Sequence, residues 1–266
     1  MLRPRIIPCL LVKNKGLVKT VRFGASKYVG DPINAVKIFN EKEVDELIVL
    51  DIDATTTGAG PDFKMIQNLA AECRMPLCYG GGVKTVEQAK TIISLGVEKV
   101  ALSAAVLANP ELVTEIANEI GSQSMVVVLD VKKRLFGGKY EIWTHNAKVN
   151  TGKCPIEFAQ LLEKMGVGEI VLNSIDNDGE MKGYDVSLVK QVREVTTVPL
   201  SVVGGAGSLK DIGNLISQFG IIGAVAGSLF VFKGVYKAVL ISYPNPADKE
   251  QLILSSYRAD QTKDSR

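Results

Sequence analysis

Five aspartates lie at or just beyond the ends of short apolar runs, where a carboxylate could take part in acid/base chemistry. They are Asp51, Asp53, Asp130, Asp176 and Asp178. Asp130 directly follows the apolar run Met125–Leu129, so we expect its side chain to point into an active-site mouth as a general acid or base. A solvated loop charge is the alternative for each aspartate. His145, the single histidine, is interpreted as a surface residue.

Two glycine-rich segments, Gly80–Gly82 and Gly204–Gly207, each follow an apolar run and precede an expected helix. Glycine lets backbone N–H groups approach a phosphate, which also meets the positive end of the helix. Ser103-Ala104 and Gly227-Ser228 would complete two such sites, and the turn at Asp178-Gly179 could also hold phosphate. Two symmetric sites predict a substrate with a phosphate at each end, whereas tight turns are the alternative explanation for these glycines.

Short apolar runs alternate with amphipathic stretches along the whole chain, which predicts parallel strands joined by crossover helices. Helices are expected at Pro32–Lys42, capped by Asp31, and at Thr85–Leu95, ended by Gly96. Eight strands in a chain of this length predict a single (β/α)₈ barrel of the α/β class, with its active site where the strands end. The strands are expected at Arg5–Leu11, Glu46–Asp51, Leu77–Gly80, Lys99–Leu102, Met125–Asp130, Glu169–Asn173, Leu200–Val203 and Gly223–Ala226.

The chain also repeats itself. Leu10-Leu11-Val12-Lys13 recurs as Leu129-Asp130-Val131-Lys132, an offset of about 120 residues that suits half of a barrel domain. We therefore expect two homologous half-barrels, about 1–122 and 123–243, followed by a polar, frayed tail over about 245–266. The repeat places Leu11 where the second half carries Asp130.

Two connections are long enough to cover the barrel mouth. Lys13–Gly30 follows the first strand and Lys133–Lys153 follows the fifth. The second contains Gly137-Gly138 between two strand-like segments, which predicts a hairpin. Because loops that follow strands build the active face of a barrel, both are candidate lids.

Composition narrows the functional classes. The chain has 266 residues, is 46% hydrophobic and 23% charged, and carries a net charge of +2, without the basic stripe and interleaved aromatics of a nucleic-acid binder. Its four cysteines show no metal-ligand spacing, so we expect reduced thiols, no metal and no cofactor. With no apolar signal core and no membrane-spanning run, a cytoplasmic location is expected.

Seven further motifs run from Arg5 to about Lys237. They are Arg5-Ile6-Ile7-Pro8-Cys9-Leu10, Gly30-Asp31-Pro32, Asp45-Glu46-Leu47, Tyr79-Gly80-Gly81-Gly82, Asn150-Thr151-Gly152, Ser174-Ile175-Asp176-Asn177-Asp178-Gly179 and Gly204-Gly205-Ala206-Gly207. With these motifs the chain resembles the cyclase subunit of imidazole glycerol phosphate synthase, a barrel that uses ammonia from a glutaminase in histidine biosynthesis.

The resemblance implies roles for the residues at the mouth. In that family two aspartates, ending strands one and five, act as general acid and base on a ribulosyl bisphosphate-type substrate. Asp130 matches the second, whereas Leu11 replaces the first. Leucine cannot transfer a proton, and loss of one such group typically costs about 10²–10⁴ in rate.

The resemblance also implies two phosphate sites. The first-half site would use Gly82, Ser103 and Ala104, although Ser103-Ala104 departs from the Asn-Thr pair of the family. The second-half site looks retained and would use Asp178, Gly179, Gly205, Gly227 and Ser228.

At the opposite end, the family carries a charged ring through which ammonia enters the barrel. Arg5, Glu46, Lys99 and Glu169 match all four ring positions. Four buried charges at strand starts are costly unless they pair with one another. Glu98 matches a carboxylate that helps to dock the glutaminase, so the resemblance implies a glutaminase partner on this face.

A barrel that keeps the ring but only one carboxylate of the pair is expected to pass ammonia to another acceptor. Gly16-Leu17-Val18-Lys19-Thr20 and Tyr28-Val29-Gly30-Asp31-Pro32 resemble the cyclase paralogue of bacterial surface-polysaccharide clusters. That paralogue acts with a glutaminase and an ATP-dependent sugar amidotransferase to turn an acetamido group into an acetamidino group. The ligand would be a phosphorylated small molecule or a nucleotide sugar, and since no Walker loop occurs here, ATP would be used elsewhere.

Two alternatives stay open. The chain could be a true histidine-pathway cyclase in which Asp51 or Asp176 substitutes for the missing aspartate. It could also be a non-catalytic partner that only activates a glutaminase and channels its ammonia.

Overall fold

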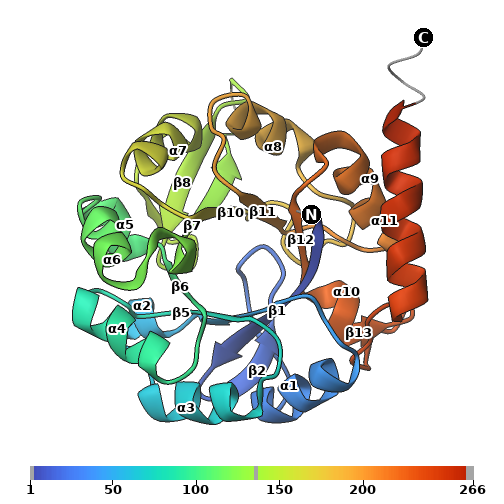
Figure 1. Ribbon diagram of the computed structural model, residues 1–266, viewed down its shortest axis with the longest axis horizontal. Coiled ribbons are helices and arrows are strands. Elements are labelled where there is room, and N and C mark those ends of the chain that lie inside the picture. The colour runs from blue at the N-terminus through green and yellow to red at the C-terminus, as the bar shows by residue number, and fades with distance from the viewer. Residues whose placement is uncertain (1–2, 135–136, 262–266) are drawn as a thin grey trace.

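Eight parallel strands close into a barrel surrounded by helices (Figure 1). The computed structural model describes residues 3–134 and 137–261. The barrel strands are β1 (Arg5–Lys13), β4 (Leu47–Asp51), β5 (Leu77–Gly80), β6 (Lys99–Leu102), β7 (Met125–Lys133), β10 (Glu169–Ser174), β11 (Leu200–Val203) and β12 (Gly223–Ala226). Pairing of β12 with β1 closes the ring, which confirms the predicted (β/α)₈ barrel.

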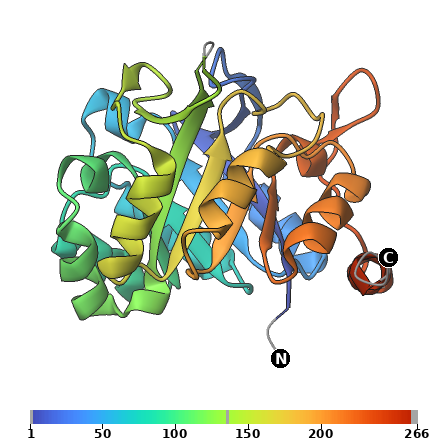
Figure 2. The same ribbon diagram turned by 90° about the horizontal axis from the view of Figure 1, so that it is seen from above.

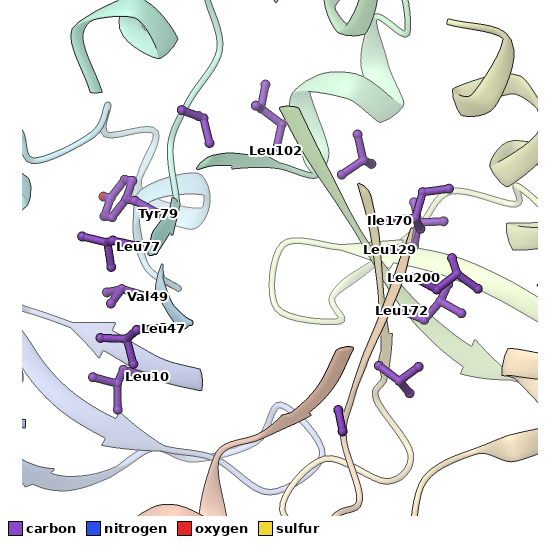
Figure 3. Close-up of a cluster of buried hydrophobic side chains, with 14 of the residues drawn as sticks. Leu10, Leu47, Val49, Leu77, Tyr79, Leu102, Leu129, Ile170, Leu172 and Leu200 are labelled. Carbon is purple, nitrogen blue, oxygen red and sulfur yellow. The ribbon is translucent and has the colours of Figure 1, made fainter. Parts of the chain in front are cut away.

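Alternating side chains along each strand build two apolar cores. Residues that point outward, such as Leu10, Val49 and Tyr79, pack against the helices and lie side by side on neighbouring strands (Figure 3). Residues that point inward fill the barrel lumen with Ile7, Cys9, Ile48, Cys78, Ala101, Val126, Val128, Val171 and Val225. All four cysteines are free thiols, as expected.

The outer layer consists of helices that follow the strands. They are α1 (Pro32–Glu41), α2 (Ala54–Thr57), α3 (Phe63–Glu72), α4 (Val86–Ser94), α5 (Ala104–Ala108), α6 (Leu112–Ile120), α7 (Pro155–Lys164), α8 (Val186–Arg193), α9 (Leu209–Phe219), α10 (Ser228–Val231) and α11 (Pro246–Gln261), with a 3₁₀ turn at Ser122–Ser124. Asp31 caps α1 by accepting the Asn34 backbone N–H at 2.8 Å, and α4 ends before Gly96, both as predicted.

Three hairpins extend beyond the barrel. β1 turns back into β2 (Gly16–Lys19), which pairs with β3 (Lys27–Gly30). β7 turns back into β8 (Tyr140–Thr144), which pairs with β9 (Val149–Asn150), so the predicted hairpin is confirmed, although residues 135 and 136 lie outside the described ranges. The third pairs β13 (Phe232–Lys233) with β14 (Ala238–Val239). The matching extensions of β1 and β7 accord with two half-barrels, whose boundary near residue 122 stays a prediction.

The expected frayed tail is wrong for most of its length, because α11 forms there. Pro246 begins the helix, and the Asn245 side chain accepts the Asp248 backbone N–H at 2.8 Å. Ile253 is buried, and the helix packs against α9. α11 lies lengthwise in Figure 1 and end-on in Figure 2, so it crosses the outside of the barrel. Only the expectation for residues 262–266 falls outside the described chain.

Neither a membrane-spanning helix nor a metal cluster is found in the part of the chain that the structure describes. No helix there is long and apolar enough to cross a bilayer. No group of three or more His, Cys, Asp or Glu side chains in 3–134 and 137–261 is arranged to hold a metal ion.

Candidate functional site

A cavity of about 440 Å³ opens where the eight barrel strands end. Every barrel strand contributes to its wall, with Cys9 and Leu11 from β1, Leu50 and Asp51 from β4, Gly80 from β5, Leu102 from β6, Val128 and Asp130 from β7, Asn173 from β10, Val203 from β11 and Ala226 from β12. This is the end of a (β/α)₈ barrel at which catalytic groups gather.

All nine residues predicted for the mouth line this cavity. They are Gly82, Ser103, Ala104, Asp130, Asp178, Gly179, Gly205, Gly227 and Ser228. Of the other carboxylates, Asp51 also lines it, whereas Asp53 and Asp176 are not among its lining residues. Asp176 instead accepts the Lys133 backbone N–H at 2.9 Å, which secures the start of the β7–β8 turn. Asp176 is therefore poorly placed to replace a missing catalytic carboxylate.

Asp130 sits in the cavity wall with one firm hydrogen-bond donor. The Asn173 Nδ2 atom donates to Asp130 Oδ1 at 2.8 Å, because the two residues are register partners on β7 and β10. Burial raises the pKa of Asp130 to about 7, the Asn173 hydrogen bond lowers it, and the Asp178 charge raises it. A carboxyl group with this pKa can donate or accept a proton near neutral pH.

Leu11 continues the apolar lumen upward to the cavity. Its register partner on β4 is Leu50, and both side chains pack on the lumen core with Val203. The wall at this position is therefore apolar, without a group that could exchange a proton.

Lys19 is a functional candidate that the sequence prediction missed. It is 5% exposed, lies on β2 and lines the cavity. Its Nζ atom donates to the Cys9 backbone oxygen at 2.6 Å, and burial lowers its pKa. An added Cβ on Gly227 would lie 2.5 Å from this Nζ, so the ammonium group adjoins the Gly227-Ser228 segment. In the sequence, the one indication of a role for Lys19 is that a lysine occurs within a strand-like segment of the connection after the first strand.

Asp178 organises the loop that covers one side of the cavity. Its Oδ2 atom accepts the Thr20 hydroxyl at 2.8 Å and the Phe23 backbone N–H at 3.2 Å. Burial raises the pKa of Asp178, and these hydrogen bonds and the Lys19 charge lower it. The Lys13–Gly30 connection is thereby fastened to the Asp178-Gly179 turn, which fits a lid that is held in place.

Short helices begin beside the cavity at both predicted phosphate sites. α5 and α10 begin at Ala104 and Ser228, and neither helix start is capped by a side chain. Gly205 has φ +113°, and a Cβ added there would lie 2.0 Å from the Gly183 backbone oxygen, so only glycine fits. His145 is exposed as predicted, although it lines the cavity.

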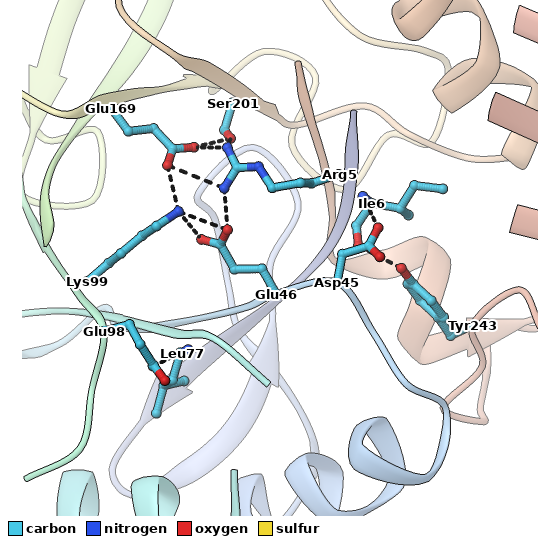
Figure 4. A network of polar contacts seen from close by, with 10 residues as sticks. All are labelled: Arg5, Ile6, Asp45, Glu46, Leu77, Glu98, Lys99, Glu169, Ser201 and Tyr243. Atoms are coloured by element: carbon cyan, nitrogen blue, oxygen red, sulfur yellow. Dashed lines mark hydrogen bonds and ion pairs between the residues drawn. The ribbon is translucent and has the colours of Figure 1, made fainter. Parts of the chain in front are cut away.

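At the other end of the barrel, the four predicted charges form a closed network (Figure 4). Lys99 Nζ lies 2.9 Å from both carboxylate oxygens of Glu46 and 2.8 Å from Glu169 Oε2. Arg5 donates to Glu169 Oε1 at 2.6 Å and also to Glu46. Burial opposes ionisation of Glu169, yet the Arg5 and Lys99 charges lower its pKa. The ring therefore carries two cations and two carboxylates in mutual contact.

The ring lies between the apolar barrel lumen on one side and the protein surface on the other. Ser201, which was not predicted, donates its hydroxyl to Glu169 on β10. Glu98 is exposed beside the ring, and its Oε2 atom accepts the Leu77 backbone N–H at 2.7 Å. Above the ring, the apolar lumen core leads toward the cavity at the mouth.

The comparisons with known proteins agree with this arrangement. The family model described as histidine biosynthesis protein matches residues 5–237. A Vibrio vulnificus protein, provisionally named imidazole glycerol phosphate synthase subunit hisF3, is 58% identical over 95% of this chain and 97% of its own length. A Pseudomonas aeruginosa protein, provisionally named subunit hisF2, is 52% identical over 92% of this chain and 97% of its own length.

A more distant relative carries the same subunit name without qualification. Subunit HisF of imidazole glycerol phosphate synthase from Hyphomonas neptunium is 40% identical over 87% of this chain and 91% of its own length. With a closed barrel, a cavity at the strand ends and a charged ring at the strand starts, the chain belongs to the histidine biosynthesis protein family, among the HisF-like cyclase-type subunits of imidazole glycerol phosphate synthase.

Proposed function

We propose that this chain is the ammonia-using subunit of a glutamine amidotransferase complex. In this proposal it delivers glutaminase-derived ammonia for acetamidino-sugar formation in surface polysaccharide (O-antigen) biosynthesis, where an ATP-dependent sugar amidotransferase activates the acceptor. The observation that carries the proposal is an intact charged ring at one end of the barrel combined with Leu11 at the other. The ring is what ammonia transfer needs, and Leu11 removes half of the acid/base pair that cyclisation needs.

The ammonia path would run from the ring through the lumen to the cavity. Ammonia is uncharged, so it can enter an apolar passage, whereas ammonium would lose its hydration there at a high energetic cost. The side chains along this path include Ile7, Ile48 and Val171. A glutaminase would seat on the ring face, with the exposed Glu98 at its edge.

The cavity would bind the phosphate of a sugar phosphate or nucleotide sugar. Gly205, Gly227 and Ser228 would offer backbone N–H groups, and Lys19 Nζ adjoins Gly227, a combination that would favour an anion. Asp178 would act by shaping the Gly179 turn, since its oxygens are occupied by the covering loop. On the first-half side, Gly82, Ser103 and Ala104 offer similar backbone groups.

A genuine histidine-pathway cyclase is the second candidate, and Asp130 specifically favours it. Its pKa of about 7 suits a group that both gives and takes a proton. Asp51 is the other carboxylate in the cavity wall and would have to act in place of the residue at position 11. Its Oδ1 atom, however, accepts the Asp53 and Ala54 backbone N–H groups, which fixes it as a turn-forming residue.

Turnover of the histidine-pathway ribulosyl substrate with excess ammonium separates the two candidates. We expect the natural chain to be inert and Leu11→Asp to gain activity, with Leu11→Asn as a matched control of similar shape that cannot donate a proton. Turnover by the natural chain at about 1 s⁻¹ or more, an ordinary enzyme rate, would instead assign it to the histidine pathway.

Ammonia transfer is tested at the ring. In the complex with its glutaminase, Lys99→Met is expected to lower glutamine-dependent product formation while ammonium-dependent product formation is retained. The ratio of the two rates in one preparation cancels any loss of folded protein. An unchanged ratio would argue against passage through the ring.

A further inference from the structure

The β13–β14 hairpin carries the most exposed apolar side chains of its region. Val235 and Tyr236 at its tip are 95% and 96% exposed, and Val239 and Leu240 are about half exposed. The two side chains at the tip bury almost nothing in the fold, so their apolar surface contributes little to its stability. Contiguous exposed apolar residues of this kind mark interaction sites.

This hairpin lies beside the cavity rim without lining the cavity itself. It follows α10, whose first residue, Ser228, lines the cavity. Figure 2 shows the hairpin projecting on the same side of the barrel as the β7–β8 hairpin. Its base also meets the lid segment, because Lys27 Nζ on β3 lies 5.3 Å from the centre of the Phe232 ring.

The charge of Lys237, in the hairpin turn, also acts on the loop after β10. The hydrogen bond from Lys182 and the charges of Arg22 and Lys237 hold the pKa of Glu180 below its usual value. Glu180 directly follows Asp178-Gly179, which line the cavity. The hairpin therefore lies near two loops that bear cavity residues.

The charge around the tip has one dominant sign. Lys233 and Lys237 of the hairpin are exposed, and so are Arg22, Lys27 and Lys182 on neighbouring segments, where Glu180 pairs with Arg22 and Lys182. A complementary partner presents acidic side chains around a small apolar pocket that accepts an aromatic ring. Tyrosine in such a pocket, ringed by charge pairs, is typical of the residues that dominate protein interfaces.

We propose that the β13–β14 hairpin is the docking site for the enzyme that consumes the ammonia, with Tyr236 and Val235 seated in an apolar pocket inside an acidic rim. This inference rests on the proposed function, in which an ATP-dependent sugar amidotransferase is the acceptor enzyme. A protein held at this rim also covers the mouth of the cavity. Ammonia leaving the barrel then meets the activated acceptor before it reaches bulk water.

The test measures binding of this chain, in complex with its glutaminase, to the purified ATP-dependent sugar amidotransferase of the same organism. Val235→Ser/Tyr236→Ser removes the tip without touching the core. Leu254→Ser is the matched control, since Leu254 is 51% exposed on α11. We expect the double variant to weaken binding at least about tenfold and the control to bind as the natural chain does. Glutaminase activity of the complex should be unchanged in both.

The outcomes distinguish failure of this inference from failure of the proposed function. If the natural chain and the double variant bind equally well, the hairpin inference is overturned while the proposed function stands. If the amidotransferase does not bind the natural chain at all, both are overturned. Sedimentation with phosphatidylglycerol vesicles that the double variant abolishes would identify a membrane contact instead, and would likewise overturn the protein docking site.

Discussion

Replacing Lys99 by methionine should unbalance the charged ring in a measurable way. The substitution keeps an apolar stem but leaves Arg5 as the one cation facing Glu46 and Glu169. Removing one partner of a buried ion pair typically costs about 3–5 kcal/mol. Because Arg5 still contacts both carboxylates and Lys99 is 18% exposed, we expect a loss of about 2–3 kcal/mol in the free energy of unfolding near pH 8.

The pH dependence identifies the cause of the loss. In the natural protein the pKa of Glu169 is lowered, so its ionised form stabilises the fold above the unfolded-state pKa. Burial raises the pKa of Glu169, and without the Lys99 charge less remains to lower it, so the pKa of a ring carboxyl rises. A carboxyl whose folded-state pKa is raised favours the fold at low pH and loses that advantage as pH increases. The deficit of Lys99→Met should therefore shrink between pH 8 and pH 5.

Urea unfolding followed by circular dichroism at the two pH values measures this deficit. Lys90→Met is the matched control, because Lys90 pairs with Glu119 at 2.8 Å on the exposed helical surface, where an ion pair contributes little. A Lys99→Met deficit that equals that of the control, or that is the same at pH 5 and pH 8, would refute the charge argument.

Three further perturbations test the mouth and the core. Asp130→Asn should raise the free energy of unfolding by about 1–3 kcal/mol near pH 8 and by less at pH 5. The reason is the raised pKa of Asp130, which makes its ionised form destabilise the fold as pH increases. A pH-independent effect in urea unfolding would contradict this. Gly205→Ala should lower thermal stability far more than Gly58→Ala. Both glycines have a positive φ, but a Cβ at position 205 would clash with the Gly183 backbone oxygen, whereas Gly58 has open space around it. Equal losses of thermal stability would show that the clash is unimportant. Tyr79→Phe should leave the free energy of unfolding unchanged or raise it by up to about 1 kcal/mol. The buried Tyr79 hydroxyl has no hydrogen-bond partner in the described chain, although the Asp62 backbone amide lies nearby. A clear loss of stability in urea unfolding would show that the hydroxyl does form a hydrogen bond with that amide.

The barrel itself was predictable because its strands are short apolar runs bounded by clear turn residues. Leu77–Gly80, Lys99–Leu102, Leu200–Val203 and Gly223–Ala226 were predicted with the bounds that the structure has. The mouth residues followed from the same logic, since a residue that ends a parallel strand must lie at the active end of the barrel.

Other features depend on register and tertiary contact, which local sequence does not carry. Asn173 meets Asp130 only because β7 and β10 pair in one register. Lys19 reaches the cavity only because β2 folds back along β1. The helix α11 was missed because it buries the polar residues Lys249 and Ser256 beside Ile253. The sequence therefore lacks the continuous apolar stripe that predicts an amphipathic helix.

The charged ring also bears on the predicted division of the barrel into two half-barrels. Arg5, Glu46 and Lys99 come from the first four strands, and Glu169 comes from the second four. Taken alone, the first set carries one excess positive charge and the second set one negative charge. Two copies of the first half would bring unpaired cations together at the ring. Two copies of the second half would bury the Glu169 carboxylates without a cation from the ring. Among these pairings of the predicted halves, unlike halves give a neutral ring, so the ring charges would favour the complete chain over pairs of identical fragments.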